Sequence, residues 1–127
     1  MDYRDFPENC SANDTRIAAR VLQTQLTHIV GIGGGVVCDI AGFAASTFMR
    51  GLRYGFVATS LLSQVDASVG GKNGVNFAGY KNMIGVFNQP EFVICDPDLL
   101  NTLPPREILS GLAEVVKHGI IASPDLF

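Results

Sequence analysis

The sequence predicts an α/β fold in which helices pack on a parallel sheet. Two observations lead to this prediction. Short apolar runs, which are typical of buried parallel strands, alternate along the chain with longer segments of helical periodicity. The first apolar run also ends in a glycine-rich loop, GIGGGVVCD, which opens directly into a helical segment.

The first half of the chain supplies two of the expected strands. Residues 1–13 are polar and irregular, and a helix should follow because Ile17 and Val21 have helical spacing and Asp14 can cap its start. The expected elements up to residue 68 are, in order, a helix over 14–26, a strand over 28–33, a helix over 36–50, a strand over 54–60 and a short helix over 61–68.

The second half begins with a glycine-rich region and ends in a helix. The glycine density of residues 69–85 indicates turns rather than a regular element. A third strand is expected over 90–96, and the two prolines at 104–105 predict the start of a final helix over 106–121. One face of that helix carries the apolar residues Leu109, Leu112, Ala113, Val116 and Ile120. Three strands are few for an independent sheet, so we expect this chain to be part of a longer protein.

Composition excludes several classes of protein. The 127 residues have a formal net charge of −3 and no lysine or arginine cluster, which argues against a nucleic-acid-binding surface. The most apolar window, residues 31–49, contains Asp39 and five glycines and is therefore not expected to span a membrane. The three cysteines are few and widely spaced, as is typical of reduced thiols in a cytoplasmic protein.

The glycine loop is the first candidate site. A strand that ends in Gly33–Gly35 and opens a helix presents free backbone N–H groups, and the helix dipole favours a negative charge there. Cys38 stands where a dinucleotide fingerprint has its third glycine, whose main role is to allow close packing of helix and strand. From the residues alone, the loop can be a phosphate site or a structural turn. Asp39 can likewise be a first-turn charge or a cofactor ligand.

Two further groups can carry chemistry. Lys72 and Lys81 lie in glycine-rich segments and are each followed by asparagine, a pattern that suits a phosphorylated substrate, with Asp66 nearby in sequence. The alternative is a pair of ordinary solvated lysines. Glu114 and Lys117 have i, i+3 spacing, which fits either a surface ion pair or a metal-binding carboxylate beside a substrate-binding lysine. His28 and His118 lack a second histidine at ligand spacing, so neither is assigned to a metal.

Four segments, taken together, resemble the 3-dehydroquinate synthases. They are GGGVVCDIAGFAASTFMRG, VATSLLSQVDASVGGKNGVN, YKNMIGVFNQP and TLPPREILSGLAEVVKHG, and the resemblance covers residues 28–121. It implies a Rossmann-like NAD-binding α/β domain, here partial and spanning residues 1–103, followed from 104 to 127 by the first helix of an all-helical metal-binding domain. The implied reaction converts 3-deoxy-D-arabino-heptulosonate 7-phosphate to 3-dehydroquinate and phosphate in the shikimate pathway. NAD would be reduced and regenerated, and zinc or cobalt would act as a Lewis acid.

The resemblance also implies roles for individual residues. Positions that match cofactor-binding residues are Gly33, Gly34, Gly35, Val36, Val37, Cys38, Asp39, Thr59, Ser60, Lys72, Lys81, Leu99, Leu100, Asn101 and Thr102. Positions that match substrate-binding or catalytic residues are Arg50, Asp66, Lys72, Asn82 and Lys117, with Arg50 able to serve a neighbouring subunit of a homodimer. Glu114 matches the carboxylate metal ligand.

The resemblance leaves some features of the family unmatched. Most members have glycine at the position of Cys38, and the family's acidic ribose site and two histidine metal ligands match no residue of this chain. We therefore expect no turnover from the 127 residues alone, because catalytic zinc normally has three protein ligands. The alternatives are a related sugar-phosphate cyclase, a polyol dehydrogenase, or a non-catalytic nucleotide-binding protein.

Overall fold

The computed structural model describes residues 27–122, so the irregular segment 1–13 and the helix expected over 14–26 lie outside the described residues. Its elements are, in order, β1 (His28–Gly33), α2 (Gly35–Thr47), η2 (Phe48–Arg50), β2 (Arg53–Ala58), η3 (Ser63–Ala67), β3 (Lys72–Phe77), β4 (Tyr80–Phe87), β5 (Phe92–Cys95), η4 (Pro97–Thr102) and α3 (Pro105–Ala122). No described helix is long and apolar enough to cross a membrane.

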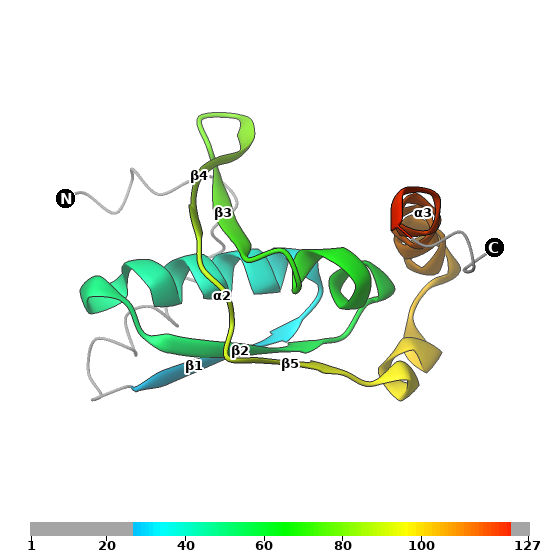
Figure 1. Cartoon of the computed structure of the whole chain (residues 1–127), viewed down its shortest axis with the longest axis horizontal. Coiled ribbons are helices and arrows are strands. Elements are labelled where there is room, and N and C mark those ends of the chain that lie inside the picture. Colours follow the sequence, from blue (N-terminus) through cyan, green and yellow to red (C-terminus); the bar gives the residue numbers. More distant parts are fainter. Residues whose placement is uncertain (1–26, 123–127) are drawn as a thin grey trace.

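Three parallel strands form the main sheet, in the spatial order β1-β2-β5. Helix α2 connects the first two strands and covers one face of the sheet (Figure 1). The strands and helices alternate as the sequence predicted, which confirms the α/β fold with a parallel sheet.

The core lies between α2 and β2. Cys38 and Ala45 of the helix pack on Tyr54 and Phe56 of the strand, and all four side chains are buried. The helix can approach closely because its buried residues are small and because Gly31 of β1 lies beneath it. A Cβ atom on Gly31 would lie 2.9 Å from the Cβ of Ala41 and 3.1 Å from the Phe56 ring.

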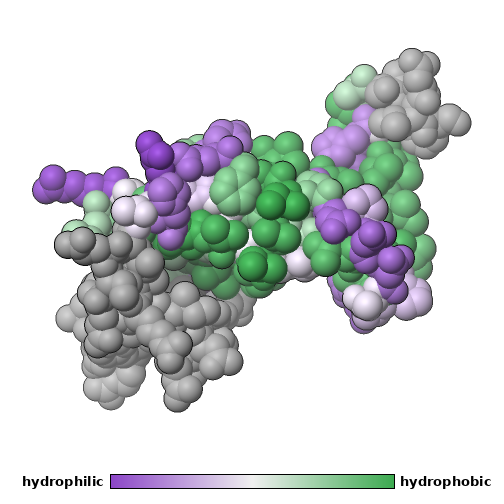
Figure 2. Space-filling model, turned by 90° about the horizontal axis from the view of Figure 1, so that it is seen from below, coloured by the Kyte–Doolittle hydropathy of each residue, from purple (hydrophilic) through white to green (hydrophobic). Residues whose placement is uncertain are grey.

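The opposite face of the sheet is open within residues 27–122. The strands run in sequence order across the sheet, and right-handed connections that advance in one direction all lie on the same face. The residues left on the other face include Val30, Ile32, Phe92 and Ile94, which are 49%, 65%, 42% and 50% exposed. Figure 2 shows this apolar surface from below. We call these four residues the open sheet face.

The glycine-rich region forms an antiparallel hairpin of β3 and β4, so the expectation of turns over residues 69–85 is wrong. Gly74 and Gly85 lie opposite each other in the hairpin. A Cβ on Gly85 would lie 2.6 Å from the Asn73 carbonyl oxygen, and one on Gly74 would lie 3.0 Å from that of Ile84. These glycines therefore allow two strands to approach closely, a role that composition does not distinguish from turn formation.

Helix α2 ends three residues earlier than the sequence suggested. Met49 and Arg50 have positive φ values of 44° and 74°, and Gly51 follows with φ 113°. Positive φ is disfavoured for residues with a side chain, so this corner holds backbone strain. The final helix, expected over 106–121, is confirmed as α3.

Candidate functional site

The glycine loop joins the carboxyl end of β1 to the first turn of α2. Gly34 is the N-cap of α2 in an extended conformation, and no side chain caps the helix. A Cβ on Gly34 would lie 3.3 Å from the Ser60 hydroxyl, and one on Gly35 would lie 3.2 Å from the Ala67 Cβ. The loop is thus a narrow cradle with an uncapped helix N-terminus, which fits a phosphate group.

Cys38 fills the position of the missing third glycine. Its side chain is fully buried under the loop, and its Sγ lies 4.0 Å from the Gly33 carbonyl oxygen. Burial raises the pKa of this thiol to about 11. Cys38 therefore acts as a small packing residue between helix and strand.

Asp39 is half-buried and lies just beyond the first turn of α2, which contains no acidic residue, so the interpretation of Asp39 as a first-turn charge is wrong. Burial raises the pKa of its carboxyl to about 6, against the opposing effect of the Lys81 ammonium, and the Asp66 charge raises it further. Asp39 next to the loop, Lys81 of the hairpin and Asp66 of η3 are therefore close enough for their charges to interact.

The segment after β2 meets the loop. The Thr59 amide donates a hydrogen bond of 2.9 Å to the Gly33 carbonyl. Ser60 is held by Ser63, whose buried hydroxyl accepts a hydrogen bond of 3.0 Å from the Ser60 amide and donates one of 2.8 Å to the Ser60 carbonyl. The two predicted cofactor segments, 33–39 and 59–60, are therefore side by side.

A single π-helical turn, η3, presents Asp66. The turn is closed by Ser68, whose amide and hydroxyl donate to the Ser63 carbonyl at 3.1 Å and 2.6 Å. Such turns often occur at functional sites, because the extra residue changes the direction of the side chains. Sequence reasoning predicted a short helix here and did not identify Ser63 or Ser68.

The segment 99–102 lies in η4, at the edge where the strands end. Gln64 connects this segment to the site, because its amide donates to the Ala58 carbonyl at 3.1 Å and to the Asp96 carbonyl at 3.0 Å. The Asp96 carboxylate caps η4 by accepting from the Asp98 amide at 2.9 Å. Gln64 was not predicted from the sequence.

Helix α3 packs on the residues before η3 through Gly111. A Cβ on Gly111 would lie 2.6 Å from the Leu61 Cβ and 2.7 Å from the Leu62 amide nitrogen, so only glycine permits this approach. This contact brings Lys117 next to Asp66, with 3.4 Å between Nζ and Oδ1. Lys117 also lies against the Glu114 carboxylate, which is the leading cause of its raised pKa.

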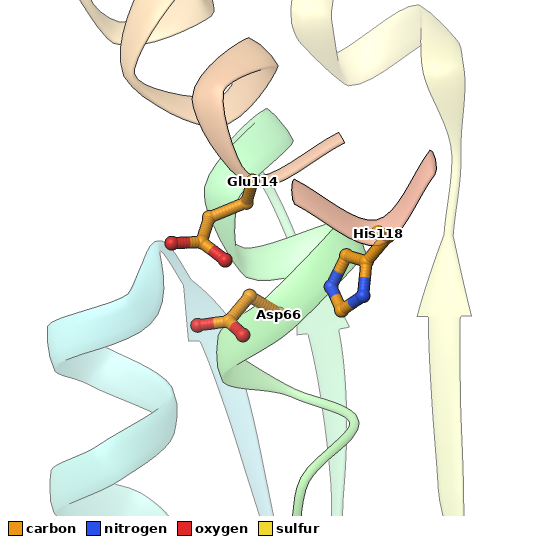
Figure 3. A group of neighbouring side chains, drawn as sticks. All are labelled: Asp66, Glu114 and His118. Atoms are coloured by element: carbon orange, nitrogen blue, oxygen red, sulfur yellow. The ribbon is translucent and has the colours of Figure 1, made fainter. Parts of the chain in front are cut away.

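Asp66, Glu114 and His118 form a cluster that can hold a cation. One ligand atom from each lies within 4.8 Å of the others. Figure 3 shows the Glu114 and Asp66 carboxylates next to each other, with the His118 imidazole to one side of Asp66. One Glu114 oxygen is buried, and it is the oxygen that contacts the Lys117 ammonium, so a cation already lies against this carboxylate. Oxygen and imidazole donors suit a divalent metal such as zinc, so these residues fit one. His118, which spacing left unassigned, is a candidate ligand beside Glu114.

The remaining predicted site residues lie in the hairpin and after the end of α2. Lys72 and Lys81 are exposed on β3 and β4, and Asn82 has a positive φ of 51°. Arg50 is not brought to the cluster. It lies beyond the other end of α2, whose 13 residues span roughly 20 Å (Figure 1).

Comparison with known proteins identifies related chains. The profile of the family described as 3-dehydroquinate synthase N-terminal matches residues 9–110. A 3-dehydroquinate synthase of Gloeobacter violaceus is 52% identical over 119 residues, which are 88% of this chain and 33% of that relative. The chain thus spans about a third of the length of the curated relatives it matches.

Solved structures with this fold include two cyclases. A 2-epi-5-epi-valiolone synthase from Streptomyces hygroscopicus subsp. jinggangensis, with NAD+ and Zn2+ bound, superposes with a TM-score of 0.82 at 29% identity, covering 94% of this chain and 35% of that one. A 2-deoxy-scyllo-inosose synthase, complexed with carbaglucose-6-phosphate, NAD+ and Co2+, gives a TM-score of 0.78 at 32% identity, covering 89% and 32% of the two chains.

Proposed function

Because this chain belongs to the 3-dehydroquinate synthase family, we propose that it forms the nucleotide-binding part of a 3-dehydroquinate synthase active site. The proposed enzyme is a lyase of the cytoplasm that converts 3-deoxy-D-arabino-heptulosonate 7-phosphate to 3-dehydroquinate and phosphate. One observation carries the proposal. The glycine loop, Asp66 and the Glu114–Lys117 pair come from three separate segments, and Asp66 and Lys117 are 51 positions apart, yet they meet at one edge of the sheet.

NAD is the proposed cofactor, and its support is the cradle between the loop, Ser60 and Ala67. When bound, NAD would accept a hydride from the substrate and return it. The backbone N–H groups of 34–36 would bind the pyrophosphate, and the Thr59 and Ser60 hydroxyls would contact the cofactor. The remaining proposed NAD contacts are Val37, Asp39, Lys72, Lys81, Leu99, Leu100, Asn101 and Thr102, while Cys38, which is fully buried, would support the loop from beneath rather than contact NAD with its side chain.

A divalent metal, zinc or cobalt, is the second proposed cofactor. Glu114 would hold it through the buried oxygen, and the metal would polarise a substrate oxygen. Asp66 and His118 lie close enough to contribute. Lys117 would then leave Glu114 and be free to bind the substrate, because a metal and an ammonium compete for the same oxygen.

The substrate phosphate and carboxylate would be bound by cations and an amide. Lys72, Asn82 and Lys117 would supply charge-assisted hydrogen bonds. Arg50 cannot reach the same site, so its proposed role requires a homodimer in which it enters the site of the partner subunit. The division between a nucleotide-binding domain to residue 103 and a helical domain from 104 belongs to the same proposal.

NAD binding is the first test, and it uses the full chain. Gly35→Asp places a carboxylate in the cradle and should abolish NAD binding in titration calorimetry, because the negative charge would lie where the pyrophosphate binds. Gly79→Asp is the matched control, since a Cβ there meets no atom within 4 Å and aspartate tolerates the left-handed φ of 80° at this position better than most residues. Equal NAD affinity of the two variants would exclude the loop as the cofactor site.

Catalysis is tested in a chimera. Residues 28–121 would replace the matching segment of the Gloeobacter violaceus relative, and turnover with the heptulosonate phosphate would be measured. Lys72→Ala in this chimera should lower kcat/KM at least about 100-fold, or roughly 2.7 kcal/mol of transition-state stabilisation. A loss smaller than threefold would identify Lys72 as an ordinary solvated lysine. Turnover of another sugar phosphate but not of this substrate would favour the related cyclases.

A further inference from the structure

Asn73 is a buried amide at the base of the β3–β4 hairpin, where it contacts three hydrogen-bond acceptors. Its side chain is 4% exposed. The two hydrogens of the Nδ2 group are shared among three acceptors, the Tyr54 hydroxyl at 2.9 Å, the Asn88 carbonyl at 2.9 Å and the Gly71 carbonyl at 3.3 Å. These acceptors belong to the central strand of the sheet and to the segments that enter and leave the hairpin. The single amide thus joins three parts of the chain.

The acceptors are also joined to each other and to α2. The Tyr54 hydroxyl donates to the Asn88 carbonyl, and the Asn88 amide donates to the Gly71 carbonyl at 2.8 Å. The Asn88 side chain donates to the Ser46 hydroxyl near the end of α2 at 2.9 Å. We call Asn73, Tyr54, Asn88 and Gly71 the amide clamp.

Helix α2 closes the clamp from above at Gly42. A Cβ on Gly42 would lie 1.9 Å from the Asn73 Oδ1 and 2.4 Å from its Cγ. The helix therefore contacts the amide directly, and no larger residue fits while Asn73 keeps its position. The amide is fixed on one side by hydrogen bonds and on the other by packing.

We propose that Asn73 is a positioning residue that fixes the direction of Lys72. Lys72 is exposed between two buried residues, Gly71 and Asn73, both of which belong to the clamp. Successive side chains of a strand point to opposite sides, so an Asn73 held inward directs Lys72 outward. This role rests on the proposed function, in which Lys72 binds NAD and substrate.

The clamp itself is tested by hydrogen exchange in the full chain. Asn73→Ala removes all of these donated hydrogen bonds, so the Lys72 amide should exchange at least tenfold faster. Val93→Ala is the control, because Val93 of β5 packs against the same core and belongs neither to the clamp nor to the site. If the two variants accelerate exchange at Lys72 equally, Asn73 has no specific effect on this residue and the proposal is wrong.

The positioning role is tested by a pair of compensating substitutions. Gly42→Ala alone should destabilise the fold, and adding Asn73→Ala should recover part of the lost melting temperature, because the new methyl group then meets only the Cβ of residue 73, at 3.2 Å. The double variant still lacks the clamp hydrogen bonds. We therefore expect its Kd for NAD to remain at least fivefold higher than that of the unaltered chain.

The outcomes separate this inference from the proposed function. Recovery of NAD affinity together with stability would show that Asn73 only supports the fold, and would overturn the inference. If the unaltered chain does not bind NAD, the proposed function fails, and the exchange experiment still decides whether Asn73 fixes Lys72.

Discussion

Asp39 shows how burial of a charged side chain can lower folding stability, and how a nearby opposite charge, that of Lys81, reduces this loss. The sequence left its role open between a favourable helix-dipole charge and a cofactor ligand. The structure adds partial burial, which raises the pKa of the carboxyl to about 6, and a nearby Lys81 that opposes the rise. Such costs are common at functional sites, where charge serves binding rather than stability.

Asp39→Asn should therefore stabilise the chain at neutral pH. The folded-state pKa lies above the unfolded value, so the ionised carboxyl costs stability above pH 6, and this cost shrinks as the pH falls toward 4. We expect the variant to gain about 1 to 2 kcal/mol at pH 7.5, allowing for partial exposure, and less at pH 4.5. Urea unfolding at both pH values measures the difference. A gain that is the same at both would show that charge burial is not its cause.

Cysteine reactivity should separate the two thiols in the described part of the chain. Cys38 is buried with a pKa of about 11, whereas Cys95 is exposed. Because the thiolate is the reactive form, a disulfide reagent at pH 8 should modify Cys95 at least about 100-fold faster. The experiment uses Cys10→Ser to leave these two thiols. Fast modification of both in the folded chain would contradict the packing role of Cys38.

At the scale of elements, the sequence predicted the parallel strands and both long helices, because their periodicity is continuous. The prediction failed in the glycine-rich region, because glycine occurs both in turns and where two strands approach closely. Residues 69–85 were predicted to form turns, whereas Gly74 and Gly85 allow β3 and β4 to pair. The sequence could not predict that Arg50 lies far from Asp66 or that Asp66 contacts Lys117. Both distances depend on how α2 and α3 lie against the sheet.

Gly111 should control the docking of α3. Gly111→Ala introduces a Cβ that would lie 2.6 Å from the Leu61 Cβ and 2.7 Å from backbone. The helix must then move, at a cost of about 1 to 3 kcal/mol. A paramagnetic probe such as Co2+ should also bind more weakly, because Glu114 and His118 would move away from Asp66. Ser110→Ala, on the exposed side, is the control and should match the unaltered chain in both measurements.

The molecule as a whole has apolar surface on two sides. The open sheet face is one, and α3 adds a stripe in which Leu109, Val116 and Ile120 are 67%, 45% and 71% exposed. The predicted stripe is present, but α3 packs on the body through Gly111 and through the contact between Lys117 and Asp66 instead. Periodicity identified the apolar face correctly and could not show what it contacts.

The full chain should therefore bind a hydrophobic dye and associate in solution. Ile32→Lys with Ile94→Lys should reduce dye fluorescence at least twofold with little change in melting temperature, since both side chains are already exposed. Sedimentation measures association in parallel. A chain that neither binds dye nor associates would mean that residues outside 27–122 cover the open sheet face.

The amide clamp has a consequence for the order of folding. Strands β1 and β2 and their connecting helix are contiguous in sequence, whereas β5 must find β2 across a long intervening segment. A hairpin that forms locally and is tied at its base by Gly71 and Asn88 removes residues 72–87 from that loop. The entropy lost on closing a loop grows with its length, so an early hairpin makes the last pairing of the sheet easier. The hairpin that carries Lys72 and Lys81 would then also lower the entropy cost of pairing β5 with β2.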